Sequence, residues 1–426
     1  MNAKDRIYDI AALSLLYLFL LMPVWGYLIF LGVLPKMRLS LIFGGLAALV
    51  FLFRLYLLVT GRRKMPNVQY TLLWVLLLCI TLLQLLWTPH LLSRVATDIY
   101  LMMVAFTIAA YIFLLGSEPL AFHAFQHSSW EYRIWKMLAI IFGLLLLIVI
   151  LGIVVSLVRE HQILFYFVQK HPKQVYNYQP LADSIAILSI LMMARFGRSS
   201  FSRIVMIYSV SVLALFFAYS RASLLVYIIT GGVLILLYFW ENIRKKKIYR
   251  FILLASVALI GIFGIMIWQM DGIGASRYFA AMSERYFSTE AFRQGFLGTR
   301  ASLWNQSIPL LKYYWLWGHF MYEAELFKAG EYIHNWVSFW LEYGILPFTL
   351  SLILLFWTFI SAIRQRSTSR WGNLTLTLML YNLLMITLAR SYIWRFFWFT
   401  LALSIAILAF SRHDAQTQNS LSTPLE

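Results

Sequence analysis

Twelve predominantly apolar stretches follow one another along the chain, separated by polar connections that are short in all but one case. A helix that crosses the hydrocarbon core of a bilayer needs roughly 20 mostly apolar residues, and most of these stretches reach that length. The pattern predicts an all-α, polytopic membrane protein with about twelve transmembrane helices. The stretches centre on Ala11–Leu31, Leu39–Val59, Val68–Trp87, Val95–Leu115, Ile134–Val158, Leu181–Ala194, Ile204–Tyr219, Ala222–Trp240, Phe251–Gln269, Trp336–Ser361, Leu374–Leu388 and Phe396–Phe410.

The composition supports this prediction and excludes most soluble classes. Of the 426 residues, 62% are hydrophobic and only 12% are charged, whereas soluble domains are about a quarter charged. A water-soluble enzyme and a disordered chain are both excluded. Cys79 is the single cysteine and lies inside an apolar stretch, so the chain cannot form an internal disulfide or a cysteine-based zinc cluster.

Lysine and arginine are unevenly divided between the two sets of connections. The formal net charge is +18, and these charges lie between long apolar stretches, which favours anionic lipid and an anionic substrate over nucleic acid as partners. With the N-terminus inside, 19 basic residues fall on the cytoplasmic side and 9 in the short outer connections. The positive-inside rule therefore predicts cytoplasmic termini, with residues 411–426 as a cytoplasmic tail of one integral membrane domain, 1–426.

One connection is much longer than the rest, and the same count places it on the outer face. It occupies residues 270–335, between the ninth and tenth spans. Long connections in an otherwise tightly looped protein are usually functional. We therefore expect the active site to face outward.

The acidic residues of the chain do not suit metal-dependent transfer from a nucleotide sugar. There are six Asp and eleven Glu, with no Asp-x-Asp pair and no glycine-rich phosphate loop. A divalent ion would need clustered carboxylates. We therefore expect neither a metal nor another cofactor.

The outer side is instead rich in arginine. Arg221 starts the eighth span, and Arg277, Arg285, Arg293 and Arg300 follow in the long connection. The planar guanidinium group pairs bidentately with phosphate oxygens, so this side suits a substrate that carries phosphate.

Three short motifs surround the long connection. The first is Tyr219-Ser220-Arg221-Ala222-Ser223-Leu224-Leu225. The second runs from Gly298-Thr299-Arg300-Ala301-Ser302-Leu303-Trp304 to Pro309 and Gly318. The third is His334-Asn335-Trp336, followed by Leu341-Glu342-Tyr343-Gly344.

In this order and on this topology, the motifs resemble the O-antigen ligase superfamily. That family comprises O-antigen ligases, O-antigen polymerases of the Wzy type and bacterial O-oligosaccharyltransferases. The likeness covers residues 219–347 and the twelve-span layout, and it implies a fold similar to that of GT-C glycosyltransferases. The family often repeats the glycine of the second motif, whereas here Gly318 is followed by His319.

The resemblance implies an activity and a set of site residues. Arg221 and Arg300 match the pyrophosphate-binding arginines, and His334 matches the proposed catalytic base. The implied reaction moves a glycan from undecaprenyl pyrophosphate to a hydroxyl of a lipid A-core or glycan acceptor. It takes place at the periplasmic face of the bacterial inner membrane, without metal or nucleotide.

The chemistry of these residue types agrees with that reaction. Pyrophosphate is a good leaving group, and fixed cations stabilise the charge that develops on it. Histidine accepts a proton near neutral pH and suits activation of an acceptor hydroxyl. Direct displacement would invert the anomeric centre.

Each of these residues also has a structural interpretation. Arg221 would serve as an arginine snorkelling at a helix end, Arg300 as a solvated loop charge, and His334 as an interfacial polar residue. Asp98 and Asp183 fall within spans, where a carboxylate is either functional or paired near the interface. Two further sets, Arg390 with Arg395 and the aromatic cluster Tyr313–Trp317, are interpreted as interfacial anchors, although the aromatic cluster would also stack on sugar rings.

Three functions are compatible with the sequence. An O-antigen ligase is the first, preferred because one outer loop dominates. The second is a Wzy-type polymerase with the same donor chemistry. The third is a lipid-linked glycan flippase or another transporter, a class that usually shows interrupted helices around a midplane site.

Overall fold

All regular secondary structure in the described part of the chain is helical. The computed structural model describes residues 3–31, 33–35, 39–61, 117–125, 129–160, 178–197, 199–218, 220–242, 299–319, 335–366, 371–390 and 394–421. Within these ranges, five helices are long and apolar enough to cross a membrane. The protein is therefore a helical, membrane-embedded protein.

By backbone contacts the chain forms two compact units. The first unit comprises Met1–Leu20, Arg38–Met137 and Leu303–Glu426, and the second comprises Leu21–Met37 and Leu138–Ser302. Each unit is built mainly from neighbouring antiparallel helices, as expected for apolar helices joined by short turns.

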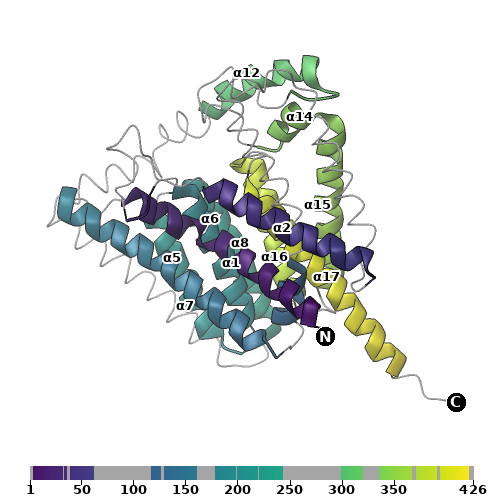
Figure 1. Cartoon of the computed structure of the whole chain (residues 1–426). Helices are drawn as coiled ribbons and strands as arrows, with labels where there is room; N and C mark the ends of the chain where they lie inside the picture. The colour runs from purple at the N-terminus through teal and green to yellow at the C-terminus, as the bar shows by residue number, and fades with distance from the viewer. Residues whose placement is uncertain are drawn as a thin grey trace. The chain divides into compact units, whose positions relative to one another are not determined.

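The second unit contains α5 (Glu131–Glu160), α6 (Tyr178–Phe196), α7 (Phe201–Phe217) and α8 (Arg221–Asn242), apart from the first turns of α5. Helices α6, α7 and α8 pack against one another (Figure 1). Most of α6 is buried, whereas α5 leaves many large apolar side chains exposed, as a lipid-facing helix does. Gly197 lies directly against the ring of Tyr238, since a Cβ at that position would overlap the ring. The glycine thus lets the end of α6 approach α8 closely.

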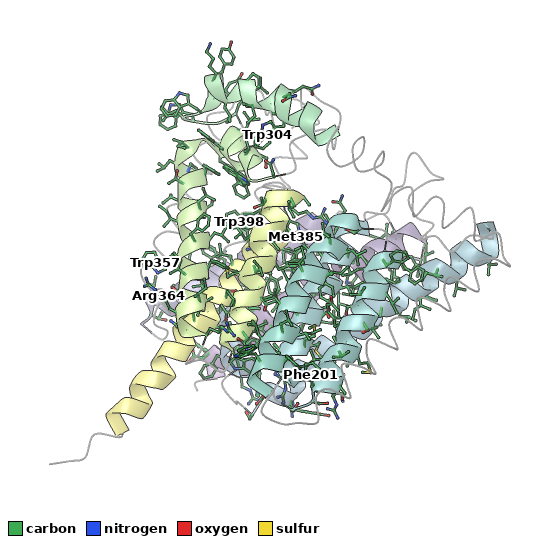
Figure 2. The ribbon with its side chains drawn as sticks, turned by 180° about the vertical axis from the view of Figure 1, so that it is seen from behind. Phe201, Trp304, Trp357, Arg364, Met385 and Trp398 are labelled. Atoms are coloured by element: carbon green, nitrogen blue, oxygen red, sulfur yellow. The ribbon has the colours of Figure 1, made fainter. Side chains whose placement is uncertain are left out.

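The first unit contains the start of α1 (Ala3–Phe30), α2 (Leu39–Val59) and a short helix over residues 117–125. It continues with most of α12 (Thr299–Tyr314), then α14 (Val337–Tyr343), α15 (Ile345–Gln365), α16 (Gly372–Leu388) and α17 (Arg395–Leu421). Helices α15, α16 and α17 pack together, and α14 contacts α15. Figure 2 shows Trp357 and Arg364 along α15 and Met385 on α16.

One ion pair and one buried hydrogen bond attach the beginning of the chain to the short helix 117–125. The Arg54 guanidinium lies 3.0 Å from the Glu118 carboxylate, and the His123 ring lies 3.1 Å from the Asp9 carboxylate. Arg54 also lies over the ring of Tyr8. The start of α1 and the end of α2 therefore lie at the same end of this unit, as the predicted alternation of spans requires.

The described helices confirm most of the predicted apolar stretches as helices. The stretch predicted at Leu39–Val59 coincides with α2, and those at Ile134–Val158, Ala222–Trp240 and Leu374–Leu388 correspond to α5, α8 and α16. The last one, Phe396–Phe410, continues as α17 to Leu421, into the segment predicted as a tail. Three predicted spans, Val68–Trp87, Val95–Leu115 and Phe251–Gln269, lie outside the described residues.

The tenth predicted stretch, Trp336–Ser361, is not one helix. It is divided at Gly344, whose φ of 80° ends α14 and precedes α15. A residue in this left-handed region cannot continue an α-helix, and glycine adopts it without steric cost. The part of this stretch that is long and apolar enough to cross a membrane is therefore α15, and α14 is a separate short helix before it.

Candidate functional site

The three predicted site residues are described to different extents. Arg221 is the first residue of α8 and Arg300 the second residue of α12, and for both the structure describes only the backbone. His334 lies outside the described residues, directly before Asn335. The surroundings of these positions are described instead through the neighbouring residues of the three motifs.

The first motif is fixed to α6 by a buried carboxylate. The Ser223 hydroxyl donates to the Asp183 carboxylate at 2.7 Å, and the Ser220 and Ser223 hydroxyl oxygens are 2.7 Å apart. Asp183 is 1% exposed, and both serines are buried. Because these serines flank Arg221, the start of α8 is held at a defined place on α6. Leaving a buried polar group without its hydrogen-bond partner costs about 1–3 kcal/mol, so this attachment holds the two helices together.

A second set of hydrogen-bonded hydroxyl groups connects α6, α7 and α8. The Ser211 hydroxyl donates to Ser189 at 2.8 Å, and Ser189 is also hydrogen-bonded to the hydroxyl of Tyr227. All three side chains are buried between α6, α7 and α8. Polar groups buried among apolar helices fix the register of those helices when they are hydrogen-bonded. The first motif therefore adjoins three helices whose register is fixed by buried hydrogen bonds.

The second motif forms a helix within the long predicted outer loop. α12 begins at Thr299-Arg300, contains Pro309, and ends in a turn that leads to Gly318. Gly318 has a φ of 71°, and its N–H donates to the Tyr314 carbonyl at 2.8 Å. The glycine thus ends α12 in the left-handed conformation that helix ends commonly use.

The second and third motifs meet at two glycines. A Cβ at Gly318 would lie 2.4 Å from the Gly344 nitrogen, and one at Gly344 would lie 2.3 Å from the Leu316 carbonyl oxygen. Only hydrogen fits between the two backbones, and both glycines also adopt positive φ. We call this contact the glycine junction.

Hydrogen bonds on both sides of the glycine junction hold it closed. The Ile345 N–H donates to the Trp315 carbonyl at 2.9 Å, and the Trp340 indole N–H donates to the same carbonyl at 2.8 Å. The His319 N–H donates to the Leu341 carbonyl at 2.8 Å. His319 therefore follows Gly318 without preventing the turn.

The third motif fixes the chain directly after His334. The Asn335 side-chain oxygen accepts the N–H of Val337 at 2.9 Å, and the Asn335 carbonyl accepts the Ser338 hydroxyl at 2.7 Å. The Asn335 side chain thereby caps the turn that leads into α14. The Trp336 ring stacks on Phe348 of α15, with ring centroids 5.5 Å apart. The residue that follows His334 is therefore well fixed.

α14 carries a buried carboxylate and lies against the start of α17. Glu342 is 1% exposed. Burial, followed by the neighbouring Glu342 carboxyl, raises the pKa of Tyr343 well above its ordinary value. The Phe339 ring contacts Phe397 and Trp398 of α17, and Figure 2 labels Trp398 near that end of α17.

The structure thus joins the second motif to the third and describes the first separately. Two residues within these motifs have no predicted role from the sequence. The structure shows that Ser223 holds Asp183 and that Glu342 is buried. A charged residue inside an apolar stretch is the signal that points to Asp183.

Arg390, interpreted from the sequence as an interfacial anchor, is a buried residue of the first unit. Its side chain is only 7% exposed, and its N–H donates to the Met385 carbonyl at 2.8 Å. Arg390 follows the end of α16, and packing by the first unit covers a side chain that hydropathy alone places at the surface. Buried arginines in membrane proteins usually serve a function.

No group of three or more His, Cys, Asp or Glu side chains in the described ranges could hold a metal ion. The prediction of a metal-free and cofactor-free site stays a prediction.

Comparison with known proteins finds no protein-family model that matches the chain, and none of the curated proteins matches it either.

Proposed function

We propose that the protein is a glycosyltransferase of the O-antigen ligase type. It transfers a glycan from undecaprenyl pyrophosphate to a lipid A-core acceptor, without metal and with inversion. The glycine junction is the observation that carries this proposal, because it brings together the ends of the second and third motifs. Motifs that resemble one family and also meet in space form a far more specific pattern than either motif does alone.

Each predicted residue has a role in this reaction. Arg221 and Arg300 bind the two phosphates of the donor and stabilise the charge on the leaving diphosphate. His334 accepts the proton of the acceptor hydroxyl as that oxygen attacks the anomeric carbon. The glycan–phosphate bond breaks and the glycosidic bond forms, leaving undecaprenyl pyrophosphate as the product.

The described contacts support precise placement of two of these positions. Asp183 and Ser223 hold the start of α8, where Arg221 lies, and Asn335 holds the chain after His334. Catalytic groups must be held within a fraction of an ångström of their productive positions. Arg221 is the first residue of α8, and Asn335 precedes α14, so side-chain attachments are found beside both motifs, as such a requirement favours.

The topology belongs to the same proposal. We infer twelve spans, cytoplasmic termini and a periplasmic active site in the bacterial inner membrane. The contacts of Arg54 with Glu118 and of Asp9 with His123 support the alternation of spans, since they join helix ends that this topology places together.

The test uses purified full-length protein in phospholipid vesicles, with undecaprenyl-pyrophosphate glycan and a lipid A-core acceptor, and without nucleotide or metal. Glycan transfer to the acceptor is expected. His334→Ala should lower the rate by about 10²–10⁴-fold, the usual contribution of a general base. His171→Ala, in the shorter outer connection, is the matched control and should keep the wild-type rate.

The same assay distinguishes a ligase from a polymerase. When only lipid-linked repeat units are supplied, a polymerase extends one unit with another. Extension of the donor, with no transfer to lipid A-core, would identify the protein as a Wzy-type polymerase and not as a ligase.

A flippase is the second candidate, and the buried charge of Arg54 favours it. Charged residues inside membrane helices often mark transport pathways, and Arg54 lies within the apolar helix α2 with 1% of its surface exposed. Movement of intact donor between leaflets, with no new glycosidic bond, would establish this function in place of the transferase.

A further inference from the structure

A surface rich in exposed aromatic side chains follows α12. It comprises Tyr313-Tyr314-Trp315-Leu316-Trp317, which we call the aromatic turn. Tyr313 and Trp317 are each 73% exposed, Trp315 is 51% exposed and Leu316 is 43% exposed. Large side chains of this kind are rarely left uncovered together on a surface that faces only water.

The aromatic turn is rigidly attached to the first residue of α15. The Ile345 N–H donates to the Trp315 carbonyl at 2.9 Å and to the Leu316 carbonyl at 3.2 Å. The glycine junction lies directly beside these bonds and leaves no room for a Cβ on either chain. The position of the turn along the axis of α15 is therefore fixed.

That position is the level of the membrane surface. α15 has 21 residues and is apolar enough to cross a membrane. At 1.5 Å per residue it is about 32 Å long, close to the roughly 30 Å of the hydrocarbon core. When α15 spans the bilayer, its first residue lies at the boundary between acyl chains and headgroups. Figure 1 shows α12 and α14 at this end of α15.

We propose that the aromatic turn binds the membrane surface, with a phospholipid bilayer as its partner. Tyr313, Trp315 and Trp317 enter the interfacial layer of the leaflet at the start of α15. Tryptophan and tyrosine are enriched in this layer because the ring is apolar while the N–H or O–H reaches water and headgroups. Lys312, exposed directly before the turn, is placed to meet lipid phosphate.

The alternative partner is a glycan stacked on the same rings, and two observations favour lipid. The bonds to Ile345 hold the turn at the start of α15, which is the depth of the interface when α15 spans the bilayer. It also exposes Leu316, an aliphatic side chain that contributes to lipid burial but offers no flat face to a sugar. Binding to lipid would hold the end of the helix that begins at Thr299-Arg300, a consequence that rests on the proposed function.

The test places a fluorophore in the turn. Because Cys79 is the single cysteine, Cys79→Ser followed by Tyr313→Cys gives one labelling site in the full-length chain. The labelled protein is reconstituted into vesicles of phosphatidylcholine and phosphatidylglycerol. Phospholipid brominated near the headgroup and aqueous iodide, present on both sides of the vesicle membrane, then serve as the two quenchers. Leu49→Cys, on the exposed side of α2, is the control within the bilayer, and Thr423→Cys is the aqueous control.

We expect the label at residue 313 to be quenched several-fold more by brominated lipid than the label at 423, and to be protected from iodide. Quenching of residue 313 by iodide, at the level of residue 423, would overturn the proposal. So would iodide access that is lost only when lipid-linked glycan is added, since that result assigns the turn to sugar. None of these readings depends on glycan transfer, so the proposed function is tested separately.

Discussion

Asp183 shows how one buried carboxylate fixes the start of a helix. It receives the Ser223 hydroxyl at 2.7 Å in an otherwise apolar setting. Ser223→Ala removes this donor from a buried carboxylate, so we expect the apparent free energy of unfolding in detergent to fall by about 1–3 kcal/mol. Ser199→Ala, at an exposed serine of the same unit, should leave it unchanged. Equal stability of the two variants would contradict the role given to Asp183.

Adding a single methyl group at Gly318 should lower the stability of the protein. Alanine at φ 71° is strained by about 1–2 kcal/mol, and its Cβ would overlap the Gly344 nitrogen. Gly318→Ala should therefore destabilise the protein and lower glycan transfer. Gly45→Ala is the control, because a Cβ there meets nothing within 4 Å and alanine favours a helix. Melting temperature and transfer rate measure both effects, and wild-type behaviour of Gly318→Ala would refute the glycine junction.

Among the elements, α14 depends most on its cap. Its seven residues are too few to form a stable helix alone. Asn335→Ala removes the side-chain acceptor of the Val337 N–H, which should cost about 1 kcal/mol. Amide hydrogen exchange in residues 337–343 should speed up about five-fold, and exchange in α16 should not change. Asn305→Ala, at an exposed residue of α12, is the control. Unchanged exchange in α14 would show that the Asn335 side chain does not stabilise the start of this helix.

Sequence patterns predict the helices far better than their interruptions. Leu39–Val59 is recovered without error as α2 because hydropathy records apolar length directly. The break at Gly344 is not predicted, because apolar residues continue on both sides of it. Its conformation is imposed by packing against Gly318, a contact between segments separated in the chain.

The same limit applies to the site. The order of Arg221, Arg300 and His334 around a long connection can be read from the sequence, whereas the attachments that hold the motifs cannot. Asp183 and Ser223 are forty positions apart, and no periodicity connects them. A charged residue inside an apolar stretch is the available signal, and it identifies a candidate without naming its partner.

At the scale of the molecule, a charged pair joins α2 to the short helix 117–125 within the first unit. Arg54 is 1% exposed and pairs with Glu118, sixty-four positions away. Breaking a buried pair by removing one partner typically costs about 3–5 kcal/mol, so Arg54→Ala should strongly lower the melting temperature. Arg364→Ala, at the exposed C-terminal end of α15, should have little effect. Similar melting temperatures for the two variants would show that the pair does not hold the unit together.

The central claim is that Arg221 and Arg300 act on one diphosphate, and a double-mutant cycle of glycan transfer tests it most directly. Arg221→Ala and Arg300→Ala should each lower the transfer rate by about 10²–10³-fold, whereas Arg285→Ala in the same connection should not. Because both arginines contact the same leaving group, the double variant should lose much less than the product of the single losses. Losses that multiply, or single variants with the wild-type rate, would contradict the claim.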